Sequence, residues 1–115
     1  MIMVIVKFKL PKKITRYQAL ETFLGTAPKY RDLSGLIRKY YFVSEDRNTA
    51  GGVYLWKSRE EADCVYTEEW KAFVRGKYGN DPMIEYLECP VVVDNISNEI
   101  ISDTATHYCS WGESA

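Results

Sequence analysis

Hydrophobic and polar positions change their spacing several times along this chain, and the changes separate strand-like from helix-like segments. Residues 1–10 are almost continuously apolar up to Val6, which predicts a strand covered on both faces. Thr15 and Gln18 have the spacing of a capping box, which marks the start of a helix. An apolar stripe at helical spacing follows: Leu20, Phe23, Leu24 and Ala27. Because Pro28 would clash with the preceding turn, we expect this helix to end or kink near Ala27.

The middle of the chain predicts a hairpin that leads directly into a helix. Residues 35–44 and 49–57 alternate like strands and flank a polar turn. Gly51 and Gly52 indicate a bulge or a close backbone approach, or only an irregular hairpin. Ser58 and Glu61 form a second capping box, where the spacing becomes helical. A further helix start at Thr67 predicts one kinked helix or two short ones, ending at Gly76 or Gly79.

A last strand is expected over residues 83–93. Pro90 lies inside it, and because proline cannot donate to a ladder, this strand should lie at a sheet edge or bulge. Residues 95–115 show no clear period and predict an extended or loosely held tail. We therefore expect one domain over residues 1–95 and a C-terminal tail over residues 96–115.

The resulting order β-α-β-β-α-β predicts an α+β protein of the ferredoxin-like class, a four-stranded antiparallel sheet with its helices on one face. Its first strand is nevertheless apolar on both sides. A bare apolar face on so small a protein predicts a partner, and a twofold homodimer packed through the helix-free face is the simplest one.

Composition narrows the choice of function class. The 115 residues include 15 basic and 16 acidic side chains, so no basic field indicates nucleic acid as a partner. Cys64, Cys89 and Cys109 are widely spaced, which argues against a disulfide scaffold and a zinc site and fits a reducing compartment. No apolar run is long enough to span a bilayer, and the apolar start lacks the form of a signal peptide. The expectation is a soluble, cytoplasmic protein.

Residues 49–62, TAGGVYLWKSREEA, resemble the hairpin-to-helix segment of the YdhR-like monooxygenases, as do residues 66–70 and 90–95. These proteins belong to the dimeric α/β-barrel superfamily, which also contains the antibiotic-biosynthesis monooxygenases. The resemblance covers roughly residues 1–95. It implies a homodimer with a pocket between sheet and helices in each subunit, and an oxidation of aromatic compounds that uses oxygen without metal or flavin.

The chain departs from the haem-degrading branch of that superfamily. Such members carry a histidine ligand on the second helix, where this chain has Phe73, Val74 and Arg75. Its only histidine, His107, lies in the unmatched tail, and a lone His107-Tyr108-Cys109 triplet lacks the orienting partner that a catalytic role needs. We therefore expect no haem, no metal and no other bound cofactor.

Aromatic side chains are the candidate substrate-binding residues, and they come from both hairpin strands and the following helix: Tyr40, Tyr54, Trp56, Tyr66 and Trp70. A tyrosine hydroxyl among them could hold a substrate oxygen. For any single one of these residues, ordinary core or dimer packing is the simpler explanation. Arg38 and Lys39 could supply a cation for an anionic substrate, or be solvated or paired charges. No residue is identified as an acid, base or nucleophile.

Three functions are compatible with these patterns. The first is a monooxygenase-like enzyme that oxidises an aromatic or apolar small molecule. The second is a noncatalytic dimer that binds a small molecule in the same pocket. The third is a dimer whose sheet face only completes the fold.

Overall fold

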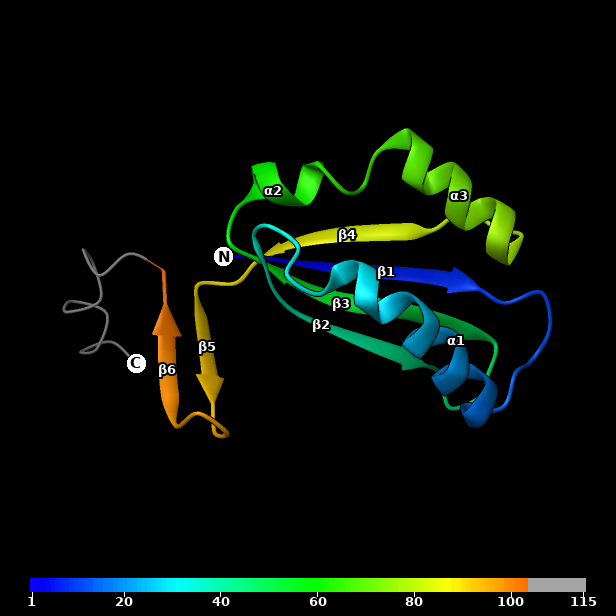
Figure 1. Cartoon of the computed structure of the whole chain (residues 1–115), viewed down its shortest axis with the longest axis horizontal. Coiled ribbons are helices and arrows are strands. Elements are labelled where there is room, and N and C mark those ends of the chain that lie inside the picture. The colour runs from blue at the N-terminus through cyan, green and yellow to red at the C-terminus, as the bar shows by residue number, and fades with distance from the viewer. Residues whose placement is uncertain (104–115) are drawn as a thin grey trace.

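The computed structural model describes residues 1–103, and its elements follow the predicted order with an additional hairpin at the end (Figure 1). The strands are β1 (Ile2–Lys9), β2 (Leu36–Val43), β3 (Thr49–Trp56), β4 (Met83–Glu88), β5 (Val91–Asp94) and β6 (Glu99–Ser102). The helices are α1 (Arg16–Tyr30), α2 (Arg59–Asp63) and α3 (Glu68–Tyr78).

The main sheet is antiparallel, with the strand order β2-β3-β1-β4. Strands β1 and β3 are central, and β4 is an edge, as the ferredoxin-like topology requires. Val4 pairs with Tyr54 and Tyr86, so these three side chains share one face of the sheet. Met3 pairs with Leu55 and Leu87 on the opposite face.

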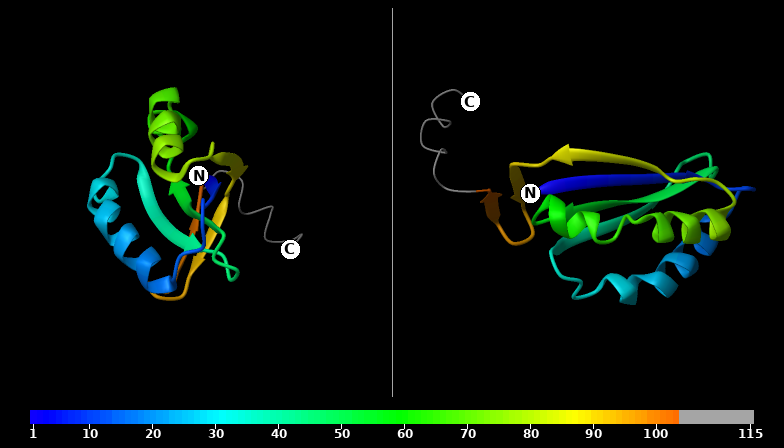
Figure 2. Two further views of the ribbon diagram at one scale, coloured as in Figure 1. Left: turned by 90° about the vertical axis from the view of Figure 1, so that its right-hand side faces the viewer. Right: turned by 90° about the horizontal axis from the view of Figure 1, so that it is seen from above.

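All three described helices cover the same face of this sheet (Figure 2). The Thr15–Gln18 capping box that starts α1 is confirmed. The second helical region consists of two short helices, α2 capped by Ser58 and α3 capped by Thr67. Helix α3 ends at Gly79, which adopts the left-handed conformation (φ 82°) that closes a helix at little steric cost.

Helix α1 differs from its prediction in length and in the side it buries. It continues past Pro28 to Tyr30, because a proline in the last turn removes only one backbone hydrogen bond there. The predicted stripe is wrong for Leu20 and Leu24, which are exposed. Ala19, Phe23, Thr26 and Tyr30, which also follow helical spacing, are the less exposed positions.

The predicted strand over residues 83–93 is wrong, since it is divided into β4 and β5 with Pro90 between them. Strand β5 pairs with β6, which lies in the segment expected to be an extended or loosely held tail. Asp94 is buried, forms an ion pair with Arg38 of β2, and accepts the amides of Ile96 and Ser97. This hairpin lies at one end of the main sheet (Figures 1 and 2).

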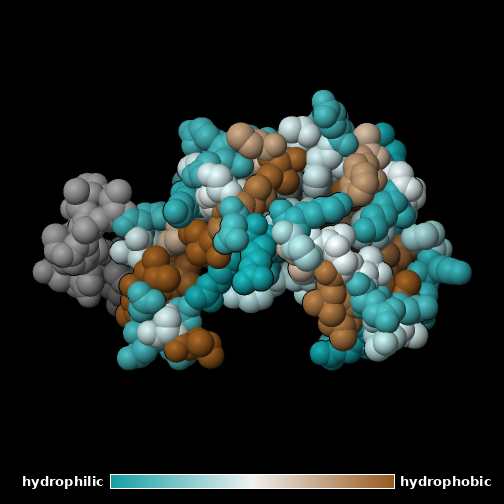
Figure 3. All heavy atoms as spheres, in the orientation of Figure 1, coloured by the Kyte–Doolittle hydropathy of each residue, from teal (hydrophilic) through white to brown (hydrophobic). Residues whose placement is uncertain are grey.

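Exposed apolar side chains gather on the β5–β6 hairpin, where they show as brown spheres at the left of Figure 3. Val91, Val93, Ile96 and Ile100 account for them. In residues 1–103 no helix is long and apolar enough to cross a membrane.

The hydrophobic core lies between the helices and the sheet face that they cover. Its buried members come from β1, β3, α2, α3 and the segment between the last two: Val4, Val6, Phe8, Ala50, Tyr54, Trp56, Ala62, Tyr66 and Val74. Trp56 is fully buried and is the largest of them. Four of these nine core residues are aromatic: Phe8, Tyr54, Trp56 and Tyr66.

Candidate functional site

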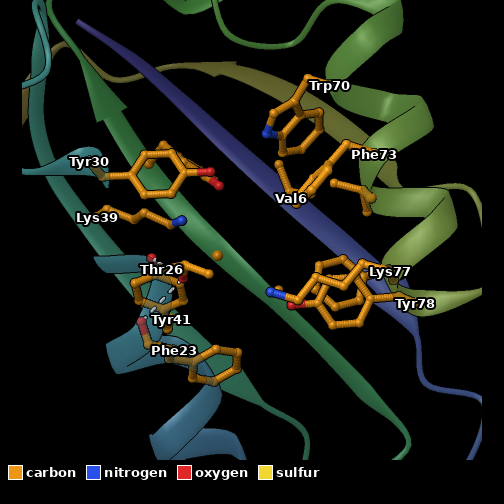
Figure 4. A pocket seen from close by; sticks show the side chains of 15 residues that line it. Val6, Phe23, Thr26, Tyr30, Lys39, Tyr41, Trp70, Phe73, Lys77 and Tyr78 are labelled. Carbon is orange, nitrogen blue, oxygen red and sulfur yellow. Dashed lines mark hydrogen bonds between the residues drawn. The ribbon is translucent and has the colours of Figure 1, made fainter. Parts of the chain in front are cut away.

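A small cavity of about 60 Å³ lies between α1 and α3 above the central strands. Figure 4 shows its two sides, with Thr26, Tyr30, Lys39 and Tyr41 facing Trp70, Phe73 and Lys77 across β1 and β3. The full lining is Val6, Phe8, Phe23, Thr26, Tyr30, Lys39, Tyr41, Gly51, Gly52, Tyr54, Trp70, Phe73, Val74, Lys77 and Tyr78. It is therefore an aromatic cavity with two lysines.

Two glycines of β3 form part of its floor. A Cβ on Gly52 would lie 3.2 Å from Cε of Lys39 and 3.1 Å from the Tyr54 ring, so the absent side chain leaves room for the lysine. A Cβ on Gly51 would overlap the carbonyl oxygen of Val6. The predicted close backbone approach is confirmed, whereas the bulge lies in β2, between Leu36 and Arg38.

The Lys39 ammonium group is surrounded by aromatic rings. Its Nζ lies 3.4 Å from the ring centroid of Tyr30, 3.9 Å from that of Tyr41 and 4.5 Å from that of Tyr54. These are cation–π distances. Burial, assisted by the positive charge of Lys77, lowers the pKa of Lys39 to about 7. At neutral pH the cavity therefore holds a lysine that can both accept and release a proton.

The aromatic walls are fixed by their own contacts. The Tyr41 hydroxyl lies 2.8 Å from Thr26 Oγ1, which donates its own proton to the carbonyl of Phe23 at 3.2 Å. Tyr41 therefore donates to Thr26, and its ring stacks on Phe23 with centroids 4.8 Å apart. Burial raises the pKa of Tyr41 and of Tyr54 above the ordinary tyrosine value, so both hydroxyls are neutral at physiological pH.

The five predicted site residues do not form one group. Tyr54 and Trp70 line the cavity. Trp56 and Tyr66 lie beside it, where Trp56 Nε1 donates to the Tyr66 hydroxyl at 3.0 Å and neither residue lines the cavity. Tyr40 pairs with Val53 on the helix-free face and is 57% exposed. The substrate-binding role of the five stays a prediction, and the structure divides them among three environments.

Beyond Tyr54 and Trp70, the lining includes Lys39, which the sequence suggested as a cation for an anionic substrate, and Tyr30 and Tyr41, which sequence reasoning did not single out. Strand alternation could have indicated both Lys39 and Tyr41. Lys39 pairs with Tyr54, and Tyr41 lies two residues further along β2, so both share the helix-covered face with Tyr54. A lysine directed into a covered face is unusual and indicates a specific role. Tyr30 lies beyond the predicted end of α1, so only the structure could place it.

The described residues also bear on the predictions about metal ligands and cysteines. Residues 1–103 contain no group of three His, Cys, Asp or Glu side chains that could hold a metal ion. Cys64 is exposed and Cys89 is half-buried. His107, Tyr108 and Cys109 lie outside the described residues.

Several solved structures share this fold, among them two oxygenases and a protein of unknown function. A monooxygenase from the gene ActVA-Orf6 of Streptomyces coelicolor, in complex with nanaomycin D, matches 76% of this chain and 86% of its own at a TM-score of 0.59 and 16% identity. A point mutant of SnoaB, a cofactor-independent oxygenase from Streptomyces nogalater, matches 82% of this chain and 97% of its own at a TM-score of 0.57 and 9% identity. NE2512 of Nitrosomonas europaea, a protein of unknown function, matches 76% and 87% at a TM-score of 0.55 and 16% identity. Such identities establish the fold alone: this is an α+β protein with the ferredoxin-like fold.

The sequence itself identifies the family. The family model described as "Putative mono-oxygenase ydhR" matches residues 3–78, more than half of the chain. The protein belongs to this mono-oxygenase family. No curated protein matches the sequence.

Proposed function

We propose that this protein is a monooxygenase that oxidises a compact aromatic substrate in the cavity between α1 and α3, without a bound metal or flavin. The observation that carries the proposal is the cavity itself, an aromatic-lined space with a lysine of lowered pKa in a member of a mono-oxygenase family. Apolar walls with a few directed polar groups are the usual composition of a small-molecule site.

The chemistry that fits is the conversion of a phenol to a quinone. The substrate supplies all the electrons: one oxygen atom of O₂ is inserted into a ring C–H bond, and the other leaves as water with the two hydrogen atoms that the phenol loses. Because the substrate is the reductant, the step requires an electron-rich ring and no separate electron donor.

The size of the cavity limits the substrate. A volume of about 60 Å³ is far below the roughly 300 Å³ at which pockets for drug-sized ligands begin. A ring can enter only when lining side chains move, and Phe73 is the one aromatic residue of the lining that is exposed (56%). We therefore expect substrates of one or two rings.

The direct test is oxygen uptake by the purified protein in the presence of single-ring and two-ring phenols and hydroquinones, with ¹⁸O₂ to locate the inserted atom. The expected result is uptake with one labelled oxygen in the product. Trp70→Ala should reduce uptake by about tenfold or more, because it removes a cavity wall. The control is Tyr17→Ala, an aromatic residue 66% exposed on α1 and outside the cavity lining, which should leave uptake unchanged.

The result that contradicts the enzymatic proposal is ligand binding without turnover. If phenols raise the thermal midpoint and no oxygen is consumed with any of them, the noncatalytic binding function is correct instead.

The same proposal includes a homodimer formed through the helix-free face of the sheet. Met3 and Ile5 of β1 share this face with Val53 and Leu55 of β3. Met83 (71% exposed), Leu87 (38%) and Tyr40 (57%) extend it to the outer strands. Leu55 is already buried within the single chain, whereas Met83, Leu87 and Tyr40 are exposed to water, and a second copy would cover them.

Sedimentation over a range of concentrations tests the dimer. We expect a dimer for the natural chain and a monomer for Val53→Glu, which places a charge at the centre of the face. A chain that remains monomeric at every concentration would contradict this part of the proposal.

A further inference from the structure

The Lys39 ammonium group has no acidic partner in the part of the chain that the structure describes. Five ion pairs are formed within residues 1–103, and none includes Lys39. Its surroundings are instead the rings of Tyr30, Tyr41 and Tyr54. A half-buried cation that is only partly compensated by ring faces attracts an anion.

A second cation strengthens this field. Lys77 of α3 lines the same cavity from the opposite side, and its charge acts on Lys39 (Figure 4). The titratable groups that face Lys39 are thus Tyr30 of α1, Tyr41 of β2, Tyr54 of β3 and Lys77 of α3. None of these four is a carboxylate, and burial keeps Tyr41 and Tyr54 neutral, so the charged side chains among the described lining residues are the two lysines.

The walls select for a flat molecule. Tyr54 and Trp70 line the cavity with aromatic rings. Gly52 contributes no side chain to the sheet side of the cavity, which leaves space there. Stacked or edge-on aromatic contacts stabilise a bound ring beyond the effect of the area that they bury. Flat apolar walls around an unpaired positive charge complement a ring that carries an anionic oxygen.

We propose that this cavity is a binding site for an aromatic oxyanion, with the charged oxygen at Lys39, supported by Lys77, and the ring between Tyr54 and Trp70. This inference rests on the proposed function and specifies its substrate class as phenols bound in the ionised form. Binding a phenol here transfers its proton to the neutral Lys39 amine, which yields a phenolate and an ammonium ion held together. The ionised ring gives up electrons to O₂ more readily than the neutral phenol does.

The lowered pKa of Lys39 agrees with this role. With a value of about 7, both the amine and the ammonium form are present in the free protein at neutral pH. A proton acceptor works best when its pKa lies near the working pH.

The experiment uses 4-nitrophenol as the probe, because its phenolate absorbs visible light and its neutral form does not. The probe is titrated into the full chain at a pH about one unit below its own pKa, so that about nine-tenths of the free probe is neutral. We expect the phenolate absorption band to grow as the probe binds. Lys39→Met should weaken binding by about tenfold or more and remove the band, and Lys77→Met should weaken binding less.

Three controls separate a lost charge from a lost fold. Lys57→Met makes the same change at an exposed lysine outside the cavity lining and should bind like the natural chain. Lys39→Arg retains the positive charge and should recover most of the affinity. 4-Nitrotoluene, which has no ionisable oxygen, should bind the natural chain and Lys39→Met equally.

Competition with benzoate distinguishes the two kinds of aromatic oxyanion. Displacement of the probe by phenols alone assigns the site to phenolates, and displacement by benzoate as well extends it to carboxylates. The inference is overturned if Lys39→Met binds the probe as tightly as the natural chain, or if the bound probe stays neutral. None of these readouts uses oxygen, so a failure of the oxygenase proposal is seen separately.

Discussion

Two aromatic regions lie side by side under the helices, and they differ in whether their polar atoms are satisfied within the protein. Trp56, Tyr66 and Tyr86 form what we call the packed cluster, in which the rings meet edge to face with centroids 6.1 Å apart. Its polar atoms are paired: Trp56 donates to Tyr66, and Tyr86 donates to Asp63 at 3.2 Å. The Lys39 cavity has equally aromatic walls but contains a charge without a counterion in the described chain.

The difference shows what identifies a site in this protein. Abundant Tyr and Trp residues are shared by both regions and so do not distinguish them. A half-buried lysine without an acidic partner in residues 1–103 is found in the cavity alone of the two. We infer that the packed cluster stabilises the fold and that the cavity binds the substrate.

Trp56→Ala should cause the largest loss of stability. The Trp56 side chain is fully buried. Its removal leaves a void and removes the hydrogen bond that Trp56 donates to the Tyr66 hydroxyl. We expect the free energy of unfolding to fall by about 3–5 kcal/mol. Urea denaturation measures the change. Trp70→Ala is the matched control, because Trp70 is only partly buried and should cost less. A loss below about 1 kcal/mol for Trp56→Ala would remove the structural role of the packed cluster.

Tyr66→Phe should lower stability by less than Trp56→Ala does, because it removes only the Trp56–Tyr66 hydrogen bond. It keeps the ring and removes only the hydroxyl that accepts from Trp56 Nε1, so a buried donor loses its partner at a cost of about 1–2 kcal/mol. Nitrophenol binding should not change, since Tyr66 does not line the cavity. A variant as stable as the natural chain, but impaired in binding, would reverse the roles assigned to the two regions.

The free energy of unfolding should also depend on pH through the titration of Lys39. Its pKa is about 7 in the folded protein and 10.5 for the ordinary side chain, so between these values the unfolded chain binds more protons. The free energy of unfolding should therefore rise with pH in this interval, by at most about 1 kcal/mol per pH unit after allowance for solvent screening. Below about pH 7 both states are protonated and this contribution is constant.

Denaturation of the natural chain and of Lys39→Met between about pH 7 and pH 9 measures this contribution, because the buried tyrosines stay protonated there in both states. The slope attributed to Lys39 is the difference between the two proteins. Parallel pH profiles would show that the lysine is solvated like any surface residue.

The order of elements could be predicted from sequence because it depends on local signals. Strand alternation, the capping residues Thr15, Ser58 and Thr67, and the glycine that ends α3 act over a few residues each. The division of residues 83–93 was missed, since the pairing of β5 with β6 depends on a later segment with no strand-like period.

The site could be predicted only in part, because it is assembled from separate elements. Tyr54 and Trp70 were found from their strand and helix, whereas Tyr40 was assigned to the same group although parity places it on the other face. The environment of Lys39 requires Tyr30 at the end of α1 and Lys77 on α3, and neither position follows from the pattern around residue 39. The sequence could indicate that Lys39 is an unusual lysine. It could not show that no acidic side chain within residues 1–103 pairs with it.

The most direct measurement is an NMR titration of Lys39, with the side-chain Nζ and Cε signals assigned by comparison with Lys39→Arg. We expect a pKa of about 7 in the free protein and a higher value once an aromatic oxyanion is bound, since the anion stabilises the ammonium form. A pKa near the ordinary lysine value of 10.5 in the free protein, unchanged by ligand, would contradict the role of Lys39 as the anion-binding group.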